Sequence, residues 1–253
     1  MEDVKRYTET AKKLLQVNLA VQTQETFLVV TDNHKEHIGR LFVAAGRELG
    51  LESIHMTMSP RQKSGEEPPS VVSEAMCVAD VVVCVTEHSL THTNARKRAV
   101  TAGARVATMP GLTLDMFSEG AVTADYGEVQ SLTERVSAIL DTGKTVIVEK
   151  NGERLAFTIE GRRAISSTGM FTQKGQSGNL PSGESYIAPV EGTAEGTVII
   201  DQSIAGIGVV SEPVKLKVTG GRLVEASGHA GEKLLQMLGD ADGRLLCEFG
   251  IGT

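Results

Sequence analysis

The first 140 residues alternate between strand patterns and helix patterns, and this alternation constrains the fold more than any other feature of the sequence. Short apolar runs rich in β-branched residues, the clearest of them at 80–85, are separated by stretches with apolar residues at helical spacing. Parallel strands need long crossover connections, and helices of this length supply them. The pattern therefore predicts an α/β fold with an N-terminal doubly wound, mostly parallel sheet. The expected strands lie at 26–30, 54–58, 80–85 and 105–108, and the expected helices at 7–15, 35–49, 93–102 and 129–140.

The pattern changes after about residue 140, where glycine-rich turns separate short strands. Asn151-Gly152 lies between two apolar runs, and Asn-Gly suits the type I′ turn of a two-residue hairpin. Gly220-Gly221 repeats this arrangement further along the chain. We therefore predict two domains, an α/β domain over 1–143 and a β-rich domain over 144–253, the second with one short helix at 232–238.

Composition argues against several classes of protein. The net charge of −7 disfavours a nucleic-acid partner or an anionic membrane surface. The longest apolar run, near 78–85, is interrupted by Asp80 and is too short to span a bilayer. The three cysteines, Cys77, Cys84 and Cys247, form no C-x-x-C pair, so we expect neither a disulfide framework nor a thiolate zinc site. A reducing cytoplasm is the expected location.

Two glutamates stand at the ends of apolar strands in the second half of the chain. Glu184 follows a Pro/Gly turn and opens one strand, and Glu248 ends a second strand that we expect at 245–247. Because carboxylates are rarely buried without a partner, two of them in such positions suggest a shared cation. With the strand period of two, Glu184 lies on the same face as Tyr186. From spacing alone, two exposed carboxylates at strand ends remain the other interpretation.

Histidines occur at two further places of interest. His88 and His92, followed by Arg96, lie between the third predicted strand and the next helix. On a helix the two histidines would share a face at i, i+4 and could bind zinc. A threonine on either side of His92 is a natural helix N-cap, however, which would leave both histidines in a loop that lines a ligand site or a domain interface, or only caps the helix. His229 lies in a glycine-rich stretch before the second domain's expected helix; a role as a ligand or as an acid or base is open to it, and we favour a solvated loop histidine.

Several segments together resemble the metallopeptidase family of aminopeptidase T and aminopeptidase S, in particular its shorter bacterial members labelled leucyl aminopeptidase. The resemblance is collinear and covers nearly the whole chain. Its most specific parts are Asn179-Leu180-Pro181 with Gly183-Glu184, and the terminal Glu248-Phe249-Gly250-Ile251-Gly252-Thr253. Thr91-His92-Thr93, Arg105-Val106-Ala107 and the run from Ala188 to Gly196 also resemble the family.

The resemblance implies a metal-dependent aminopeptidase-type hydrolase that removes N-terminal residues from short peptides. In that family two divalent ions, such as zinc or cobalt, activate the attacking water. By motif, Glu184 and Glu248 correspond to metal ligands, and we expect Asn179 and Tyr186 to support them. A homodimer is expected, and no catalytic residue is assigned.

The resemblance also leaves alternatives open. The remaining metal ligands of the family, histidines and a His-x-Asp pair, follow the terminal segment, and this sequence ends at Thr253. We therefore expect a C-terminus that is incomplete relative to the family, with weak metal binding, and an inactive truncated form is one alternative. The other is a dihydroxypyridine ring-opening dioxygenase, which resembles the same family and uses one non-haem iron on two histidines and a carboxylate. Glutamate at both 184 and 248 favours the peptidase over the dioxygenase.

Overall fold

The structure, a computed structural model, describes residues 2–253 and divides into two compact units. The first unit comprises Met1–Leu132 and Ser167–Gly183, and the second comprises Thr133–Ser166 and Glu184–Thr253. The segment 167–183 thus returns to the first unit, and these units do not follow the single division expected between residues 143 and 144. Independent folding of 144–253 stays a prediction.

The first unit is built on a five-stranded sheet in the order β2-β1-β3-β4-β8. Every neighbouring pair is parallel, and the chain adds strands on both sides of β1. The predicted α/β fold with a doubly wound parallel sheet is therefore confirmed. The strands are β1 (Thr26–Asp32), β2 (Glu52–Met58), β3 (Val81–Val85), β4 (Arg105–Thr108) and β8 (Ser177–Asn179).

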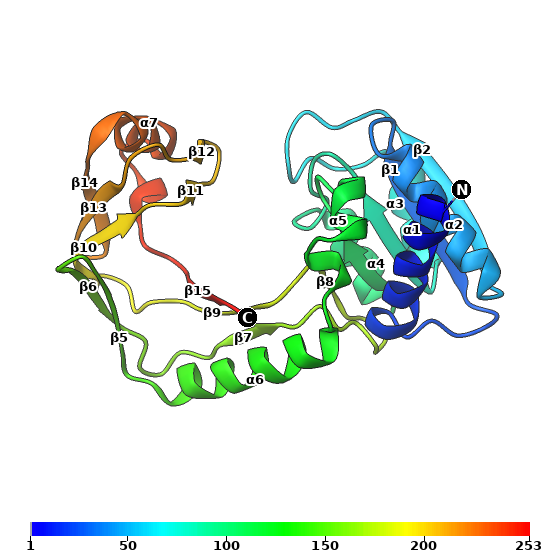
Figure 1. Ribbon diagram of the computed structural model, residues 1–253, viewed down its shortest axis with the longest axis horizontal. Helices are drawn as coiled ribbons and strands as arrows, with labels where there is room; N and C mark the ends of the chain where they lie inside the picture. Colours follow the sequence, from blue (N-terminus) through cyan, green and yellow to red (C-terminus); the bar gives the residue numbers. More distant parts are fainter. Residues whose placement is uncertain (1) are drawn as a thin grey trace. The chain divides into compact units, whose positions relative to one another are not determined.

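Helices cover both faces of this sheet (Figure 1). Alternate residues of β1 point to opposite faces, so Phe27 and Val29 enter a core with residues of α1 and α2, whereas Leu28 and Val30 enter a core with residues of α3 and α4. Four apolar side chains in succession are buried, as a strand between two helical layers requires. The helices of this part are α1 (Glu2–Lys13), η1 (Leu14–Asn18), α2 (Glu36–Glu48), α3 (Ser70–Val78), α4 (Asn94–Thr101), α5 (Leu114–Ser118), η2 (Ala121–Thr123) and α6 (Tyr126–Thr142), which continues into the second unit.

The second unit is mostly antiparallel. Its main sheet has the order β14-β13-β10-β6-β5, and both predicted hairpins are present. At the first hairpin, Asn151 and Gly152 have φ angles of 51° and 82°, the left-handed values of a type I′ turn. The strands of this sheet are β5 (Thr145–Lys150), β6 (Glu153–Thr158), β10 (Glu195–Ile200), β13 (Val214–Thr219) and β14 (Arg222–Ala226).

A smaller sheet has the order β15-β9-β7, and a short hairpin joins β11 to β12.

Helix α7 packs on β13 and β14 (Figure 1) and begins four residues earlier than the helix predicted at 232–238. His229 therefore lies in its first turn, and the interpretation as a loop histidine is wrong. The remaining elements are β7 (Ile165–Ser167), β9 (Glu184–Ile187), β11 (Ser203–Ile204), β12 (Gly208–Val209), α7 (Gly228–Leu238), η3 (Asp242–Arg244) and β15 (Phe249–Gly252).

The strand predicted at 245–247 is wrong. Leu245 forms an isolated bridge with Arg222, and the strand proper, β15, begins only at Phe249. The N–H of Leu246 donates to the carbonyl oxygen of Gly221, and its side chain packs against the core of the second unit. Leu246 is the one residue of 245–247 that packs on this core, since Leu245 and Cys247 are exposed, and pairing with β9 begins only at Phe249.

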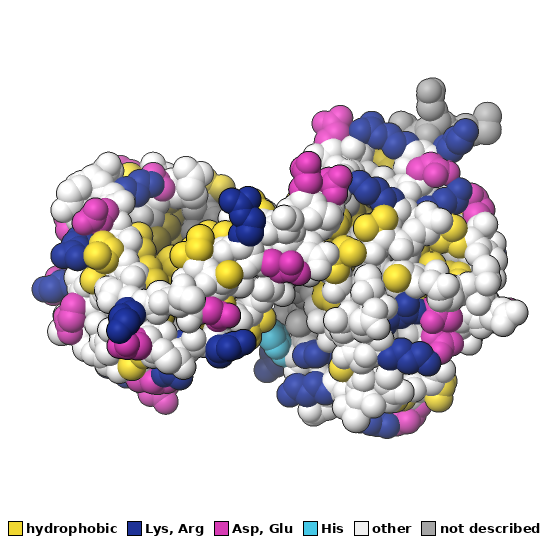
Figure 2. Space-filling model, turned by 90° about the horizontal axis from the view of Figure 1, so that it is seen from below, with side chains coloured by type: hydrophobic (Ala, Val, Ile, Leu, Met, Phe, Trp, Pro, Cys, Tyr) yellow, Lys and Arg dark blue, Asp and Glu magenta, His cyan; other side chains and the backbone are white. Residues whose placement is uncertain are grey.

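Charged side chains of both signs are interspersed over the face of the molecule seen in Figure 2, and neither sign dominates a large area of it. Such a surface offers no evident track for a polyanion, and the expectation of no nucleic-acid partner stays a prediction. Within residues 2–253, no helix combines the length and the apolar character that a bilayer crossing requires.

Gly196 tests the packing of the main sheet in the second unit. Its φ angle is 122°, and a Cβ there would overlap the carbonyl oxygen of Arg154 on β6. Because backbone strain and a backbone clash add, we expect Gly196→Ala to lower the free energy of unfolding by about 2–4 kcal/mol. Gly152→Ala is the matched control, since its φ angle is also positive but no atom lies within 4 Å of the added Cβ. Its expected cost is about 1 kcal/mol. Urea unfolding of both variants measures the difference, and equal losses would contradict the assigned clash.

Candidate functional site

The strand β9 presents Glu184 and Tyr186 on its open face. Ser185 and Ile187, which alternate with them, are 0% and 1% exposed, whereas Glu184 is exposed and Tyr186 is half-buried. The shared face of Glu184 and Tyr186 that the strand period predicted is therefore confirmed.

The antiparallel pairing with β15 brings Glu248 to the same place. Gly250 lies directly opposite Tyr186, and Gly252 lies opposite Glu184. Glu248 is two residues before Gly250, which makes it a diagonal neighbour of Tyr186 on the same face. A Cβ at Gly250 would overlap the Oε1 atom of Glu184, so this carboxylate reaches across the partner strand. We call Glu184, Tyr186 and Glu248 the carboxylate cluster.

The pKa of Tyr186 also reflects the proximity of Glu184 and Glu248. Burial raises the pKa of its phenol above the ordinary value, and the negative charges of Glu248 and then Glu184 raise it further. The phenol forms no hydrogen bond with either carboxylate in the described part of the chain. The cluster therefore offers a phenolic donor and two carboxylate acceptors to a bound molecule.

Hydroxyl groups beneath β9 hold the cluster in position. The buried Oγ of Ser185 lies 2.7 Å from the Oγ of Ser137 on α6, which in turn lies 2.6 Å from the Oγ of Ser166. At the end of β15, the Oγ1 of Thr253 lies 2.6 Å from that of Thr133, also on α6. These contacts anchor the buried face of the strand pair to the helix.

The carboxylate cluster does not by itself complete a metal site. Within residues 2–253, no group of three or more His, Cys, Asp or Glu side chains is placed to hold a metal ion. Glu184 and Glu248 supply oxygen ligands of the kind that hard cations prefer. The imidazoles that an iron or a zinc site would add are not beside them. The assignment of both glutamates as metal ligands stays a prediction.

Asn179 belongs to a hydroxyl network in the first unit, at the carboxyl end of the parallel sheet. Its Oδ1 accepts hydrogen bonds of 2.7 Å from the Oγ1 atoms of Thr91 and Thr108. Both acceptor positions of Oδ1 are thereby used, and the NH₂ group of this exposed side chain donates to no other residue in the described part of the chain. A supporting role for Asn179 at a metal stays a prediction.

His88 and His92 lie in the loop before α4, as one of the two interpretations expected. Thr93 is the N-cap, with its Oγ1 accepting from the N–H of Arg96, and the helix begins at Asn94. The zinc interpretation required both histidines on one helix face, and that geometry is not present. The guanidinium of Arg96 donates to the carbonyl oxygen of Thr91 and to the Oγ of Ser177, so it braces this loop.

Comparison with known proteins gives one family match and two solved structures with a similar fold. The family model described as NicX, 2,5-dihydroxypyridine 5,6-dioxygenase, matches residues 7–252. The structure of 2,5-dihydroxypyridine dioxygenase from Pseudomonas putida KT2440 superposes with a TM-score of 0.80 at 15% identity, over 98% of this chain and 76% of that one. Wild-type AmpT from Thermus thermophilus superposes with a TM-score of 0.69 at 16% identity, over 98% of this chain and 78% of that one. No curated protein matches the sequence.

These comparisons reverse the order of preference between the two functions predicted from the sequence. The fold is shared with AmpT, as the resemblance to aminopeptidase T implied. The family match instead supports the ring-opening dioxygenase that was the alternative. Glutamates at 184 and 248 were therefore too weak a reason to prefer the peptidase, because a pair of carboxylates is compatible with more than one chemistry.

The pKa of Tyr186 tests the geometry of the carboxylate cluster. In metal-free protein, we expect Glu248→Gln to lower the pKa of the Tyr186 phenol, because a negative charge that disfavours the phenolate is removed. Ultraviolet titration measures the change, with Tyr186→Phe in each background to isolate this phenol from Tyr7 and Tyr126. Glu160→Gln, at an exposed glutamate on another part of the second unit, is the control. An unchanged pKa would show that Glu248 is remote from the phenol.

Proposed function

Because the chain belongs to the 2,5-dihydroxypyridine 5,6-dioxygenase family, we propose that it opens a hydroxylated nitrogen-containing aromatic ring with dioxygen. The observation that carries the proposal is the family match over residues 7–252. For the substrate in the family's description, the reaction breaks the bond between C5 and C6 and places both oxygen atoms of O₂ in the product.

The carboxylate cluster supports this proposal through its hydrogen-bonding capacity. A dihydroxypyridine carries hydroxyl groups that donate and ring atoms that accept, and the cluster offers acceptors at Glu184 and Glu248 beside a donor at Tyr186. A carboxylate within reach of a ring hydroxyl can also take its proton, which makes the ring more electron-rich. The half-buried phenol ring supplies an apolar surface against which a flat substrate can lie.

We further propose a divalent metal as cofactor, with iron as the metal for ring opening. We propose Glu184 and Glu248 as the side chains that contribute oxygen ligands, because both lie near Tyr186 at the paired ends of β9 and β15. They do not amount to the two-histidine, one-carboxylate set of non-haem iron enzymes.

Metal-dependent aminopeptidase activity is the second candidate. The fold shared with AmpT favours it, as do the two carboxylates near Tyr186, Glu184 on β9 and Glu248 just before β15. Short peptides as substrates, zinc or cobalt as the metal, a homodimer and a cytoplasmic location belong to this proposal as predictions.

One experiment separates the two functions. We expect the protein with Fe(II) in air to consume one O₂ for each 2,5-dihydroxypyridine lost, followed with an oxygen electrode and by the absorbance of the substrate. Glu184→Gln and Glu248→Gln should each lower the rate at least about tenfold, because each removes a charged partner that a neutral amide does not replace. Glu160→Gln should leave the rate unchanged, since exposed ion pairs contribute little.

The same preparation is assayed with leucine 4-nitroanilide in the presence of Co(II) or Zn(II). Hydrolysis of the anilide without any oxygen uptake would establish the aminopeptidase function instead. If neither glutamate substitution lowers the rate of oxygen uptake, the carboxylate cluster is not the site of the dioxygenase reaction.

A further inference from the structure

The open face of the small sheet β15-β9-β7 carries an aliphatic side chain beside the carboxylate cluster, that of Ile165 on β7. Strand β7 is a hydrogen-bonded neighbour of β9, on the side away from β15 (Figure 1). The isoleucine is 53% exposed. A single exposed apolar residue is ordinary on a protein surface, so the significance of this one depends on how it is held and on what lies beside it.

The residues on either side of Ile165 are held by α6 and the core. The N–H of Ala164 donates to the Oδ1 of Asp141 on α6 at 2.7 Å, and the Ala164 side chain packs against the core of the second unit. The Oγ of Ser166 lies 2.6 Å from that of Ser137, also on α6. Because successive side chains of a strand alternate between its faces, Ile165 is directed to the opposite, open face.

The position of Ser166 also places Ile165 next to the carboxylate cluster. The Oγ atoms of Ser166 and Ser185 both contact the same hydroxyl group of α6, so the two serines adjoin on the buried face of neighbouring strands. Ile165 directly precedes Ser166, and Glu184 and Tyr186 flank Ser185 in the same way. Ile165 is therefore a neighbour of both on the open face, where adjoining side chains lie about 5–8 Å apart.

On the other side of β9 the open face is left free by glycine. Gly252 lies opposite Glu184 and, apart from its chain neighbours, no atom of the described residues lies within 4 Å of the position of its Cβ. The other apolar side chains of β9 and β15, those of Ile187, Phe249 and Ile251, belong to the core of the second unit or pack against it. The carboxylates, the phenol and Ile165 thus share one face with unfilled space above it.

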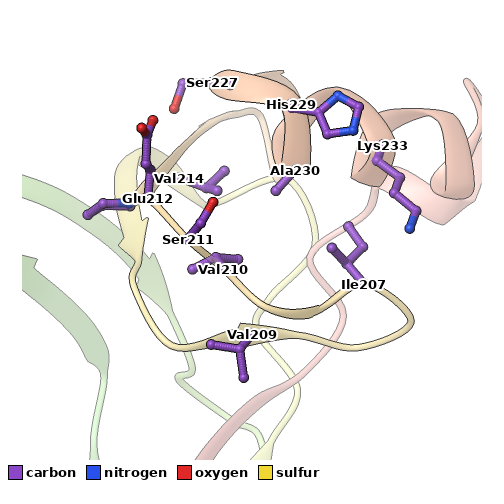
Figure 3. Close-up of a pocket in the computed structure, with 12 residues that line it drawn as sticks. Ile207, Val209, Val210, Ser211, Glu212, Val214, Ser227, His229, Ala230 and Lys233 are labelled. Atoms are coloured by element: carbon purple, nitrogen blue, oxygen red, sulfur yellow. The ribbon is translucent and has the colours of Figure 1, made fainter.

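The hollow between the segment 207–214 and the start of α7 offers no comparable surface. Val209, Glu212 and Lys233 are exposed and point outward (Figure 3), and Val214 is already buried. None of the residues that line this hollow belongs to β7, β9 or β15. The polar groups of the carboxylate cluster and an aliphatic side chain therefore adjoin on the open face of the small sheet and not in this hollow.

We propose that Ile165 forms the apolar wall of the ring-binding site, in contact with the C–H edge of the substrate ring. This inference rests on the proposed function of ring opening. The hydroxyl groups of the ring are bound by the carboxylates and the phenol. Its C–H edge needs an apolar neighbour, because a polar side chain covered by hydrocarbon would lose its water without gaining a partner. Contact with the ring also removes the exposed Ile165 surface from water.

Two substitutions of the same shape test this contact. Valine keeps the apolar surface and threonine adds a hydroxyl, and both are β-branched residues that suit a strand. We expect Ile165→Thr to raise the KM for 2,5-dihydroxypyridine about fivefold with kcat nearly unchanged, and Ile165→Val to raise it less than about twofold. Ile147→Thr is the matched control and should leave KM unchanged, because Ile147 is a 48% exposed isoleucine on β5, in the other sheet of the same unit.

Two further measurements separate binding from turnover and from stability. Anaerobic calorimetric titration of the Fe(II)-loaded protein with 2,5-dihydroxypyridine gives the dissociation constant without ring opening, and this constant should rise with KM in Ile165→Thr. Urea unfolding of Ile165→Thr and Ile147→Thr should show similar, small losses of stability, since both positions are exposed. A purely structural role of Ile165 would not raise KM in one of these variants alone.

The outcomes distinguish this inference from the proposed function. Oxygen uptake with equal KM values in Ile165→Thr and Ile147→Thr would overturn the role of Ile165 and leave ring opening in place. Binding that weakens only in Ile165→Thr, without oxygen uptake by the unmodified protein, would support the contact and contradict ring opening. If 2,5-dihydroxypyridine does not bind to the unmodified protein, both are overturned.

Discussion

The pairing of β9 with β15 is the constraint on which the candidate site depends. Its register sets Gly250 opposite Tyr186 and Gly252 opposite Glu184, so the two candidate-site side chains of β9 face positions of β15 that have no side chain. The space that a Cβ at Gly250 would take is filled by the Glu184 carboxylate. Glycine at position 250 therefore leaves room for the Glu184 carboxylate to lie over β15, on the face that also carries Tyr186. A larger residue at position 250 would place its own side chain in this space, directly opposite Tyr186.

The buried face of β9 determines how the open face is presented. Ser185 and Ile187 alternate with the functional residues, one bonded to a hydroxyl of α6 and the other in the core of the second unit. Because side chains alternate strictly, a shift of one residue would bury Glu184 and Tyr186 and expose the serine and isoleucine. Burying a carboxylate without a partner is costly, so the core and the serine hydrogen bond together hold the strand in the observed register.

The features that could be predicted from the sequence are those with local causes. The β-branched run of β3, the Thr93 cap and the Asn151-Gly152 turn are each determined by residues within a few positions, and each is confirmed. The position of β15 could not be read in this way. Of residues 245–247 only Leu246 packs on the core of the second unit, and the strand begins where pairing with β9 becomes available. Helix α3 was also missed, because its exposed Val71 and Val78 hide the helical period among apolar residues.

For the candidate site, the sequence indicated the residues but not the reason for their grouping. The face shared by Glu184 and Tyr186 follows from strand period alone, whereas the diagonal placement of Glu248 needs the register with β15. The helical position of His229 was missed because the glycines around it suggest a loop. Those glycines precede and follow it within the first turn of α7.

The same fold occurs in a dioxygenase and in AmpT, so the fold alone cannot assign the reaction. The two carboxylates do not separate the reactions either, because by themselves they complete neither the metal pair of a hydrolase nor the two-histidine, one-carboxylate set of a non-haem iron enzyme. A ring with hydroxyl groups can be recognised by the same two acceptors and one phenol through hydrogen bonds alone. The preference for ring opening therefore rests on the family to which the chain belongs, and hydrogen bonding of a hydroxylated ring by the carboxylate cluster is compatible with it.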